Sequence, residues 1–130
     1  MARIKQNEQL TTLELEIMKI LWENGSANVQ TVQQQLEREL AYTTVQTMLN
    51  VLHRKGKVER DLSDKAYVYH PTVSRSEVVR QTIGDLINRL FDGSAESLVM
   101  EMVETEHLTA EKLSRLNALI EKEAEDGNIS

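Results

Sequence analysis

The sequence predicts a mainly α-helical protein with one small β-hairpin, and three observations support this fold class. Apolar residues recur at spacings of three and four along most of the 130 residues, which is the period of amphipathic helices. Aromatic residues make up 4% of the chain, and helix-forming residues are plentiful. Two strand-like segments, 57–62 and 66–70, flank the turn residues 63–65 and predict a single hairpin. This length suffices for one core, or for a small domain with an oligomerisation arm.

Two short helices are predicted in the first part of the chain. Thr11 and Glu14 have the spacing of a capping box and start the first helix, which ends at Asn24-Gly25. Asn28 is placed to cap the second helix. The residues that these helices are expected to bury are Leu13, Ile17, Ile20 and Leu21 in the first, and Val29, Val32 and Leu36 in the second.

A third helix over residues 41–55 has two different faces. One face is an apolar stripe of Val45, Met48, Leu49 and Leu52 at helical spacing. The opposite face carries Thr43, Thr44, Thr47, Asn50 and Arg54. Gly56 ends the helix, and the basic hairpin follows. Three short helices and a hairpin with one apolar face each predict a winged helix-turn-helix domain.

The second part of the chain predicts three more helices. Ser74 and Glu77 form another capping box, Asp92-Gly93-Ser94 interrupts the helix that follows, and Thr109 is placed to cap the last one. The 57 residues from Ser74 onward make a weak core by themselves. We therefore predict a winged-helix domain at 1–73 and a helical dimerisation domain at 74–130. The residues expected between the two copies are Ile83, Ile87, Leu90, Leu98, Val99, Met102 and Leu116.

The net charge of −6 hides an uneven distribution. Residues 1–82 contain 11 basic and 10 acidic residues, whereas residues 83–130 contain 4 basic and 11 acidic ones. Surface charge is screened over roughly 8 Å at physiological salt. The third helix and the hairpin can therefore attract phosphates despite the acidic second half.

Several classes of function find no support in the sequence. There are no cysteines, which removes disulfides, thiol catalysis and cysteine metal sites. The three histidines are far apart and lack metal-ligand spacing, and no phosphate loop or nucleophile motif is present. We expect no enzyme, no metal and no cofactor. The start lacks a signal-peptide pattern and no apolar run exceeds four residues, so we expect a cytoplasmic protein with no membrane segment.

The segments described above resemble the BlaI/MecI family of bacterial penicillinase repressors. The resemblance runs from about Leu10 to Ile120 and rests on the combination of YTTV, the KG that ends the same helix, YVYHP and FDGS. It implies a homodimeric winged-helix repressor of an inverted-repeat operator, with intertwined C-terminal helices and a function connected to β-lactam resistance or a related stress response. By position, the threonines at 43, 44 and 47 fall at the front of the recognition helix, and the 62–66 hairpin tip matches the wing.

Two departures from the family are visible. Copper-responsive relatives carry a cysteine-rich C-terminal metal site, which this chain lacks. In β-lactam-responsive relatives a membrane sensor leads to proteolysis between an Asn and a Phe after the SLV segment. The matching bond here joins Glu101 to Met102, which is the candidate cleavage site for a sensor-linked protease.

The sequence therefore predicts a homodimeric transcriptional repressor that binds double-stranded DNA. Threonine hydroxyls and methyls suit base edges, and cations suit phosphates. The expected DNA-binding residues are Thr43, Thr44, Thr47, Asn50, Arg54, Lys55, Lys57, Arg60 and Lys65. A protein–protein interaction module and a small-ligand-responsive regulator are the alternatives, because a winged helix does not by itself determine function.

Overall fold

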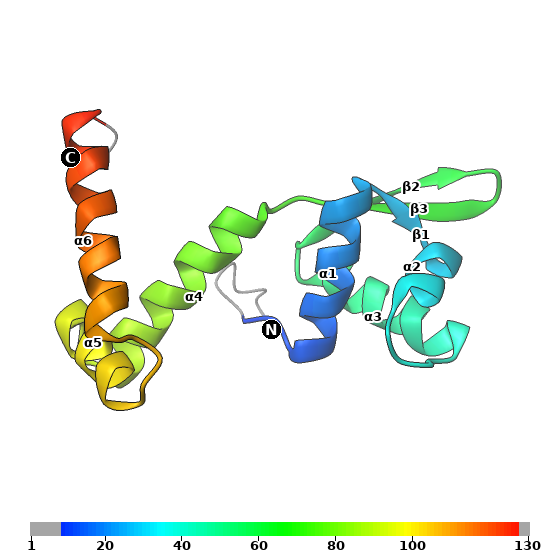
Figure 1. The fold of residues 1–130 in the computed structure, drawn as a ribbon. Coiled ribbons are helices and arrows are strands. Elements are labelled where there is room, and N and C mark those ends of the chain that lie inside the picture. Colours follow the sequence, from blue (N-terminus) through cyan, green and yellow to red (C-terminus); the bar gives the residue numbers. More distant parts are fainter. Residues whose placement is uncertain (1–8, 128–130) are drawn as a thin grey trace. The chain divides into compact units, whose positions relative to one another are not determined.

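The structure is a computed structural model that describes residues 9–127. It confirms the predicted fold class, with six helices and one small sheet (Figure 1). The elements in chain order are α1 (Thr12–Asn24), β1 (Ala27–Asn28), α2 (Val29–Gln35), α3 (Tyr42–Arg54), β2 (Val58–Ser63), β3 (Ala66–Pro71), α4 (Arg75–Leu90), α5 (Ala95–Glu104) and α6 (Ala110–Glu125).

The predicted helix starts are confirmed by their caps. Thr11 Oγ1 accepts a hydrogen bond from the Glu14 N–H at 3.2 Å, and a Glu14 carboxylate oxygen accepts one from the Thr11 N–H at 2.8 Å. The side chains of Asn28 and Thr109 likewise accept a hydrogen bond from a backbone N–H in the first turn of α2 and of α6. Ser74 Oγ accepts from the N–H of Glu77 at the start of α4. These short polar motifs set the positions at which the helices begin.

The chain divides into two compact units, one up to Thr82 and one from Ile83 onward. Helix α4 contributes its first part to one unit and its second part to the other. The domain boundary that the sequence suggests between residues 73 and 74 stays a prediction.

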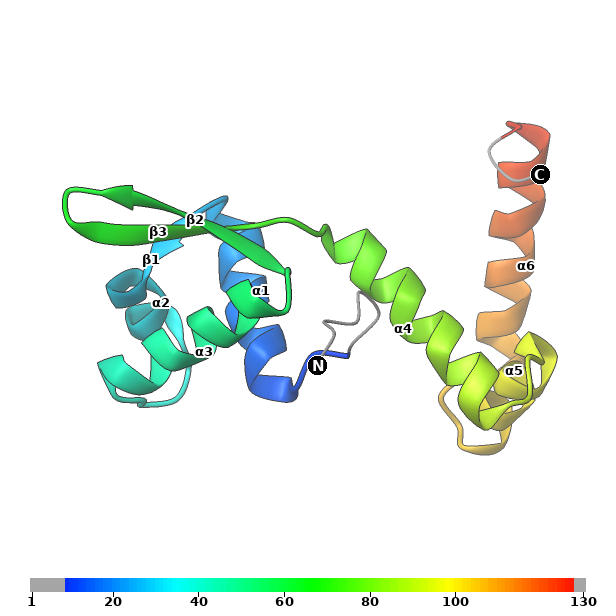
Figure 2. The same cartoon turned by 180° about the vertical axis from the view of Figure 1, so that it is seen from behind.

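The first unit has a core formed by its three short helices and the sheet (Figure 2). Side chains from α1, α2, α3, β2 and β3 meet there with almost no exposed surface. The largest of them are Ile17, Met18 and Leu21 from α1, Val32 from α2, Val45, Leu49 and Leu52 from α3, Val58 from β2 and Tyr69 from β3. Trp22 lies at the edge of this core, and its Nε1–H donates to the Val73 carbonyl at 2.9 Å.

The sheet has three antiparallel strands in the order β1-β3-β2. The predicted hairpin is confirmed, with each strand shifted or extended by one residue, and Asp64 and Lys65 form its turn. Both turn residues have positive φ, 49° and 68°, as a two-residue type I′ turn requires. Strand β1 was not predicted. Its two residues pair with Tyr69 and Val68 of β3, so it depends on a contact with a distant part of the chain.

An ion pair joins the first helix to the end of the third. Lys55 Nζ lies 2.9 Å from a carboxylate oxygen of Glu14, and the Glu14 side chain is almost completely buried. Burial alone raises the pKa of the Glu14 carboxyl. Hydrogen bonds from the Thr11 N–H and from Lys55, together with the positive charge of Lys55, outweigh that effect and lower the pKa below its ordinary value.

The second unit buries few of its apolar side chains. Leu108, in the connection between α5 and α6, is its one buried large apolar residue within the described part of the chain. Exposed apolar residues line all three helices, namely Ile83, Leu90, Val99, Met100, Leu113, Leu116, Leu119 and Ile120. A unit of this size with so little buried apolar area has little stability of its own.

Replacing Lys55 with Met should destabilise the first unit, because the buried Glu14 carboxylate would lose its cation. We expect the free energy of unfolding at pH 7 to fall by about 1–3 kcal/mol, measured by urea denaturation at a constant protein concentration. Arg54→Met, at the exposed neighbouring position, is the control and should change stability by less than about 0.5 kcal/mol.

The pH dependence of stability should follow the same pair. A lowered folded-state pKa contributes stability above the unfolded pKa of about 4.3, and this contribution is lost as the pH falls through the folded value. Glu14→Gln should therefore reduce the loss of stability between neutral and acidic pH. An acid-unfolding profile that Glu14→Gln leaves unchanged would contradict this account of the ion pair.

Candidate nucleic-acid interface

Helix α3 presents a small polar face to solvent. Val45, Leu49 and Leu52 are fully buried, which fixes the rotation of the helix about its axis. Thr43, Thr44 and Thr47 are consequently all exposed. The exposed hydroxyl and methyl groups at the start of this helix have the size and chemistry needed to approach base edges in a DNA major groove.

The connection between α2 and α3 is held by side-chain hydrogen bonds. Gln33 Nε2 donates to the Leu40 carbonyl at 2.9 Å, which ties the end of the connection back to α2. Arg38, in the same connection, forms an ion pair with Glu16 of α1 at 2.9 Å. Because α2 and α3 also share the core, the two helices form a helix-turn-helix with a defined crossing rather than two independent segments.

The two faces of the β2–β3 hairpin differ in charge. Side chains alternate along each strand, and the register pairs Arg60 with Tyr69 and Leu62 with Tyr67 on one face. On the other face Glu59 pairs with His70, whose Nε2 lies 3.4 Å from a Glu59 carboxylate oxygen. Asp61 lies beside the same histidine. Of the two, the Arg60 face is the one that suits phosphates.

Arg60 is held in place from two sides. Its Nη1–H donates to Asn50 Oδ1 of α3 at 2.8 Å, and its guanidinium lies 4.3 Å from the centroid of the Tyr67 ring. The Tyr69 hydroxyl donates to the same Asn50 oxygen at 3.0 Å. The polar face of α3 and the cationic face of the hairpin are therefore joined into one surface.

A groove of about 310 Å³ lies between the start of α2, the start of α3 and the hairpin. Gln30 and Gln46 line it together with Tyr42, Lys65 and Tyr67. Glutamine can pair with two atoms of an adenine edge, so both belong to the candidate interface, although the sequence analysis did not include them. Gln46 could have been found, because it follows Thr43 by three residues on the same helix face. The position of Gln30 depends on the packing of α2 against the rest of the unit.

The predicted cations fall into two groups. Arg54 and Lys65 are exposed, and Arg60 is partly exposed. Lys55 is partly exposed and paired with Glu14, and Lys57 is buried, with 4% of its surface exposed. The phosphate contacts that the sequence predicts for both lysines stay predictions.

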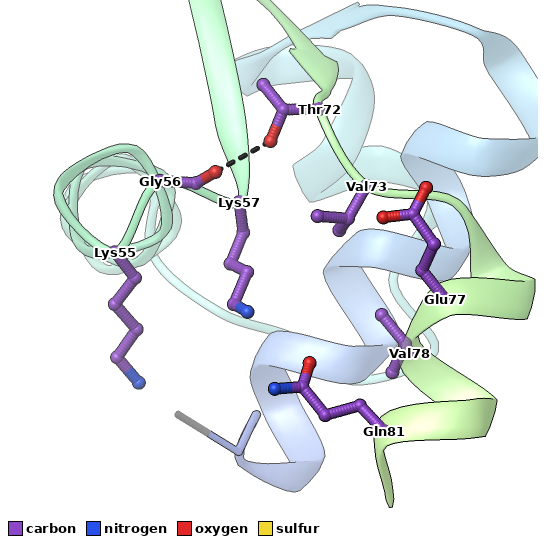
Figure 3. Close-up of a pocket in the computed structure, with 8 residues that line it drawn as sticks. All are labelled: Lys55, Gly56, Lys57, Thr72, Val73, Glu77, Val78 and Gln81. Atoms are coloured by element: carbon purple, nitrogen blue, oxygen red, sulfur yellow. Dashed lines mark hydrogen bonds between the residues drawn. The ribbon is translucent and has the colours of Figure 1, made fainter. Parts of the chain in front are cut away.

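Lys55 and Lys57 line a pocket of about 560 Å³ with residues of α4 (Figure 3). Thr72 Oγ1 donates to the Gly56 carbonyl at 2.6 Å beside it, as the dashed line in Figure 3 marks. The hydrogen bond joins the end of β3 to the turn that follows α3. This bond therefore helps to hold the base of the hairpin beside the two lysines.

The residues predicted for dimerisation lie on the sparsely buried second unit. Ile83, Leu90, Val99 and Leu116 are exposed, while Ile87, Leu98 and Met102 are partly buried. The candidate cleavage residues Glu101 and Met102 both lie within α5. Both roles stay predictions.

Between residues 9 and 127, no group of three or more His, Cys, Asp or Glu side chains is arranged to hold a metal ion. No helix in that part of the chain has the length and apolar character needed to cross a bilayer.

Comparison with known proteins supports one family. A family model described as "Penicillinase repressor" matches residues 10–122. The chain is similar to the penicillinase repressor of Bacillus licheniformis, at 28% identity over 121 residues that cover 92% of this chain and 94% of that protein. It is also similar to the transcriptional regulator BlaI of Mycobacterium tuberculosis (strain CDC 1551 / Oshkosh), at 35% identity over 127 residues, covering 92% and 89%. The YusO protein from Bacillus subtilis has a similar fold, with a TM-score of 0.51 at 18% identity over 89% of this chain and 75% of that one.

Proposed function

The chain belongs to the penicillinase repressor family, and we propose that it is a transcriptional repressor that binds double-stranded operator DNA. The observation that carries the proposal is the joined surface of α3 and the hairpin. Exposed threonines share the polar face of α3 with Asn50, which holds an arginine of the hairpin together with Tyr67. Sequence-specific binding requires groups that contact base edges and groups that position the protein on the phosphates. The threonines can supply the first, and the oriented arginine can supply the second.

The residues of this surface have different tasks in the proposed complex. Thr43, Thr44 and Thr47 meet base edges in the major groove. Arg54, Arg60 and Lys65 contact phosphates and set the position of the protein along the duplex without distinguishing bases. Repression then follows from occupancy of the promoter, and it needs no catalytic group.

The same proposal extends to the genes that the protein regulates and to its location in the cell. Relatives are named for the repression of penicillinase, which supports target genes for β-lactam resistance or a related stress response. Operator DNA in a bacterium lies in the cytoplasm, so the proposed repressor is a cytoplasmic protein.

The direct test is binding of the full chain to a duplex from upstream of its own gene, at several salt concentrations. Thr44→Ala combined with Thr47→Ala should remove the preference for this duplex over an unrelated one, because a lost base contact costs about 1–3 kcal/mol. Thr82→Ala, at an exposed helical position outside the surface, is the control and should bind like the unchanged protein.

Two outcomes would contradict the proposal. If the double variant binds the operator within about twofold of the affinity of the unchanged chain, α3 does not distinguish bases. Absence of any salt-dependent DNA binding by the unchanged chain would favour a protein–protein interaction module instead.

We further propose that the repressor is a homodimer on an inverted repeat. The apolar residues exposed on α4, α5 and α6 form a surface that is typical of a protein–protein contact. A second copy of the chain offers a matching surface by symmetry, and two linked winged helices bind two half-sites more tightly than one.

Charged substitutions on this apolar surface should separate the dimer. Ile83→Asp combined with Leu116→Asp should sediment as a monomer and bind an inverted repeat much more weakly, with single half-site binding almost unchanged. Ser114→Asp, at an exposed polar position of α6, is the matched control. A double variant that sediments as a dimer would refute the assignment of this surface.

Proteolytic induction at Glu101–Met102 stays a prediction, and the structure defines what it would require. The Glu101 carbonyl accepts a hydrogen bond from the Thr105 N–H at 2.9 Å, and the Met102 carbonyl accepts one from the His107 N–H at 2.9 Å. A protease can reach the bond only after α5 opens locally. Cleavage would separate α6 from the DNA-binding unit and weaken the dimer.

Mass spectrometry of the protein from cells exposed to a β-lactam tests this mechanism. Proteolytic induction predicts fragments that end and begin within α5, in parallel with derepression. An intact chain in fully derepressed cells would exclude it.

A further inference from the structure

Asn50 occupies the point where the recognition helix meets the hairpin. It lies on the polar face of α3, and the sequence predicts that it contacts base edges or adjacent phosphates. Its amide oxygen accepts hydrogen bonds from Arg60 at 2.8 Å and from the Tyr69 hydroxyl at 3.0 Å. The Tyr69 side chain is almost completely buried, so this bond anchors Asn50 to the core of the first unit.

The chemistry of Arg60 determines the orientation of the Asn50 amide. Arginine has five N–H donors and no acceptor, so the amide atom that faces Arg60 must be the oxygen. With two donors on that oxygen, both of its lone pairs are used. The amide nitrogen then points away from the pair, and it has no hydrogen-bond partner among residues 9–127.

This orientation restricts what Asn50 can do on DNA. Asparagine recognises adenine by accepting from the N6 amino group and donating to N7 at the same time. The oxygen needed for the first of these bonds is already occupied by Arg60 and Tyr69. Only the amide nitrogen is left, and it can donate to a phosphate or to a base acceptor but cannot recognise adenine through two bonds.

The same contacts restrict the orientation of the Arg60 side chain. Asn50 holds one edge of the guanidinium, and the Tyr67 ring covers one face. A flexible arginine loses side-chain entropy when it binds, and a preformed orientation removes part of that cost. The remaining N–H groups of Arg60 stay available for phosphate oxygens.

We propose that Asn50 is a positioning residue, which orients Arg60 toward the DNA backbone and does not distinguish adenine. The inference rests on the proposed DNA-binding function. A neutral residue would thereby control an electrostatic contact made by its neighbour.

The salt dependence of DNA binding tests this inference in the full chain. Each phosphate contact that is lost lowers the slope of log affinity against log salt by about one unit. Arg60→Ala should lower the slope by that amount, and Asn50→Ala should lower it similarly although it removes no charge. Asn50→Leu, which keeps the side-chain volume but has no acceptor, should behave in the same way if the Ala variant is unstable.

A double-mutant cycle gives an independent measure of the coupling. Asn50→Ala and Arg60→Ala should each weaken binding by about tenfold, the scale of a charge-assisted hydrogen bond. The double variant should bind almost as well as Arg60→Ala alone. Lys65 is the matched control, because the hydrogen bonds of Asn50 go to Arg60 and Tyr69 and not to Lys65. The losses caused by Asn50→Ala and Lys65→Ala should therefore multiply.

Three results would overturn the inference. The first is an unchanged salt slope in Asn50→Ala, and the second is multiplicative losses for the Asn50 and Arg60 variants. The third is a loss of preference at one adenine position in Asn50→Ala, which would make Asn50 a base-recognising residue. In each case the unchanged chain still binds its operator and the proposed function stands, whereas a chain without salt-dependent DNA binding would refute both.

Discussion

The burial of one stripe of α3 is the constraint on which the rest of the interface depends. Val45, Leu49 and Leu52 have no exposed surface, so the helix cannot rotate without exposing apolar groups at a cost of about 1.5–3 kcal/mol for each side chain. This fixes the direction of Thr43 and Thr47 on the opposite side. The same rotation places Asn50 within hydrogen-bond distance of Arg60 and Tyr69.

The hairpin adds a second constraint through the alternation of its side chains. Tyr69 is buried in the core, which determines that its face of the hairpin also carries Arg60. The acidic residues Glu59 and Asp61 are then confined to the other face. An acidic chain can bind phosphates in this way, because charges farther away than roughly 8 Å are largely screened. The sign of the local surface then matters more than the net charge of the chain.

Local patterns in the sequence were sufficient to predict most of the fold. The capping box at Thr11, the cap at Asn28 and the stripe of α3 each involve residues within one or two helical turns, and all are present in the structure. Strand β1 was missed because its pairing with β3 joins residues about 40 positions apart. No local pattern marks such a contact.

The candidate site was harder to predict for the same physical reason. Threonines on the exposed face follow from helical periodicity alone. Lys55 pairs with Glu14, which lies 41 residues earlier in the chain. The orientation of Asn50 depends on a strand that packs beside it. Charge and residue type identify candidates for phosphate binding, but tertiary contacts decide which of them remain available.

An NMR titration of the isotope-labelled chain with its own operator duplex shows whether α3 and one face of the hairpin form a single DNA-binding surface. We expect the largest chemical-shift changes to occur together at Thr43, Thr47 and Arg60, with small changes at Glu59 and His70 on the opposite face. Large changes at Glu59 and His70, with the start of α3 unaffected, would contradict this expectation.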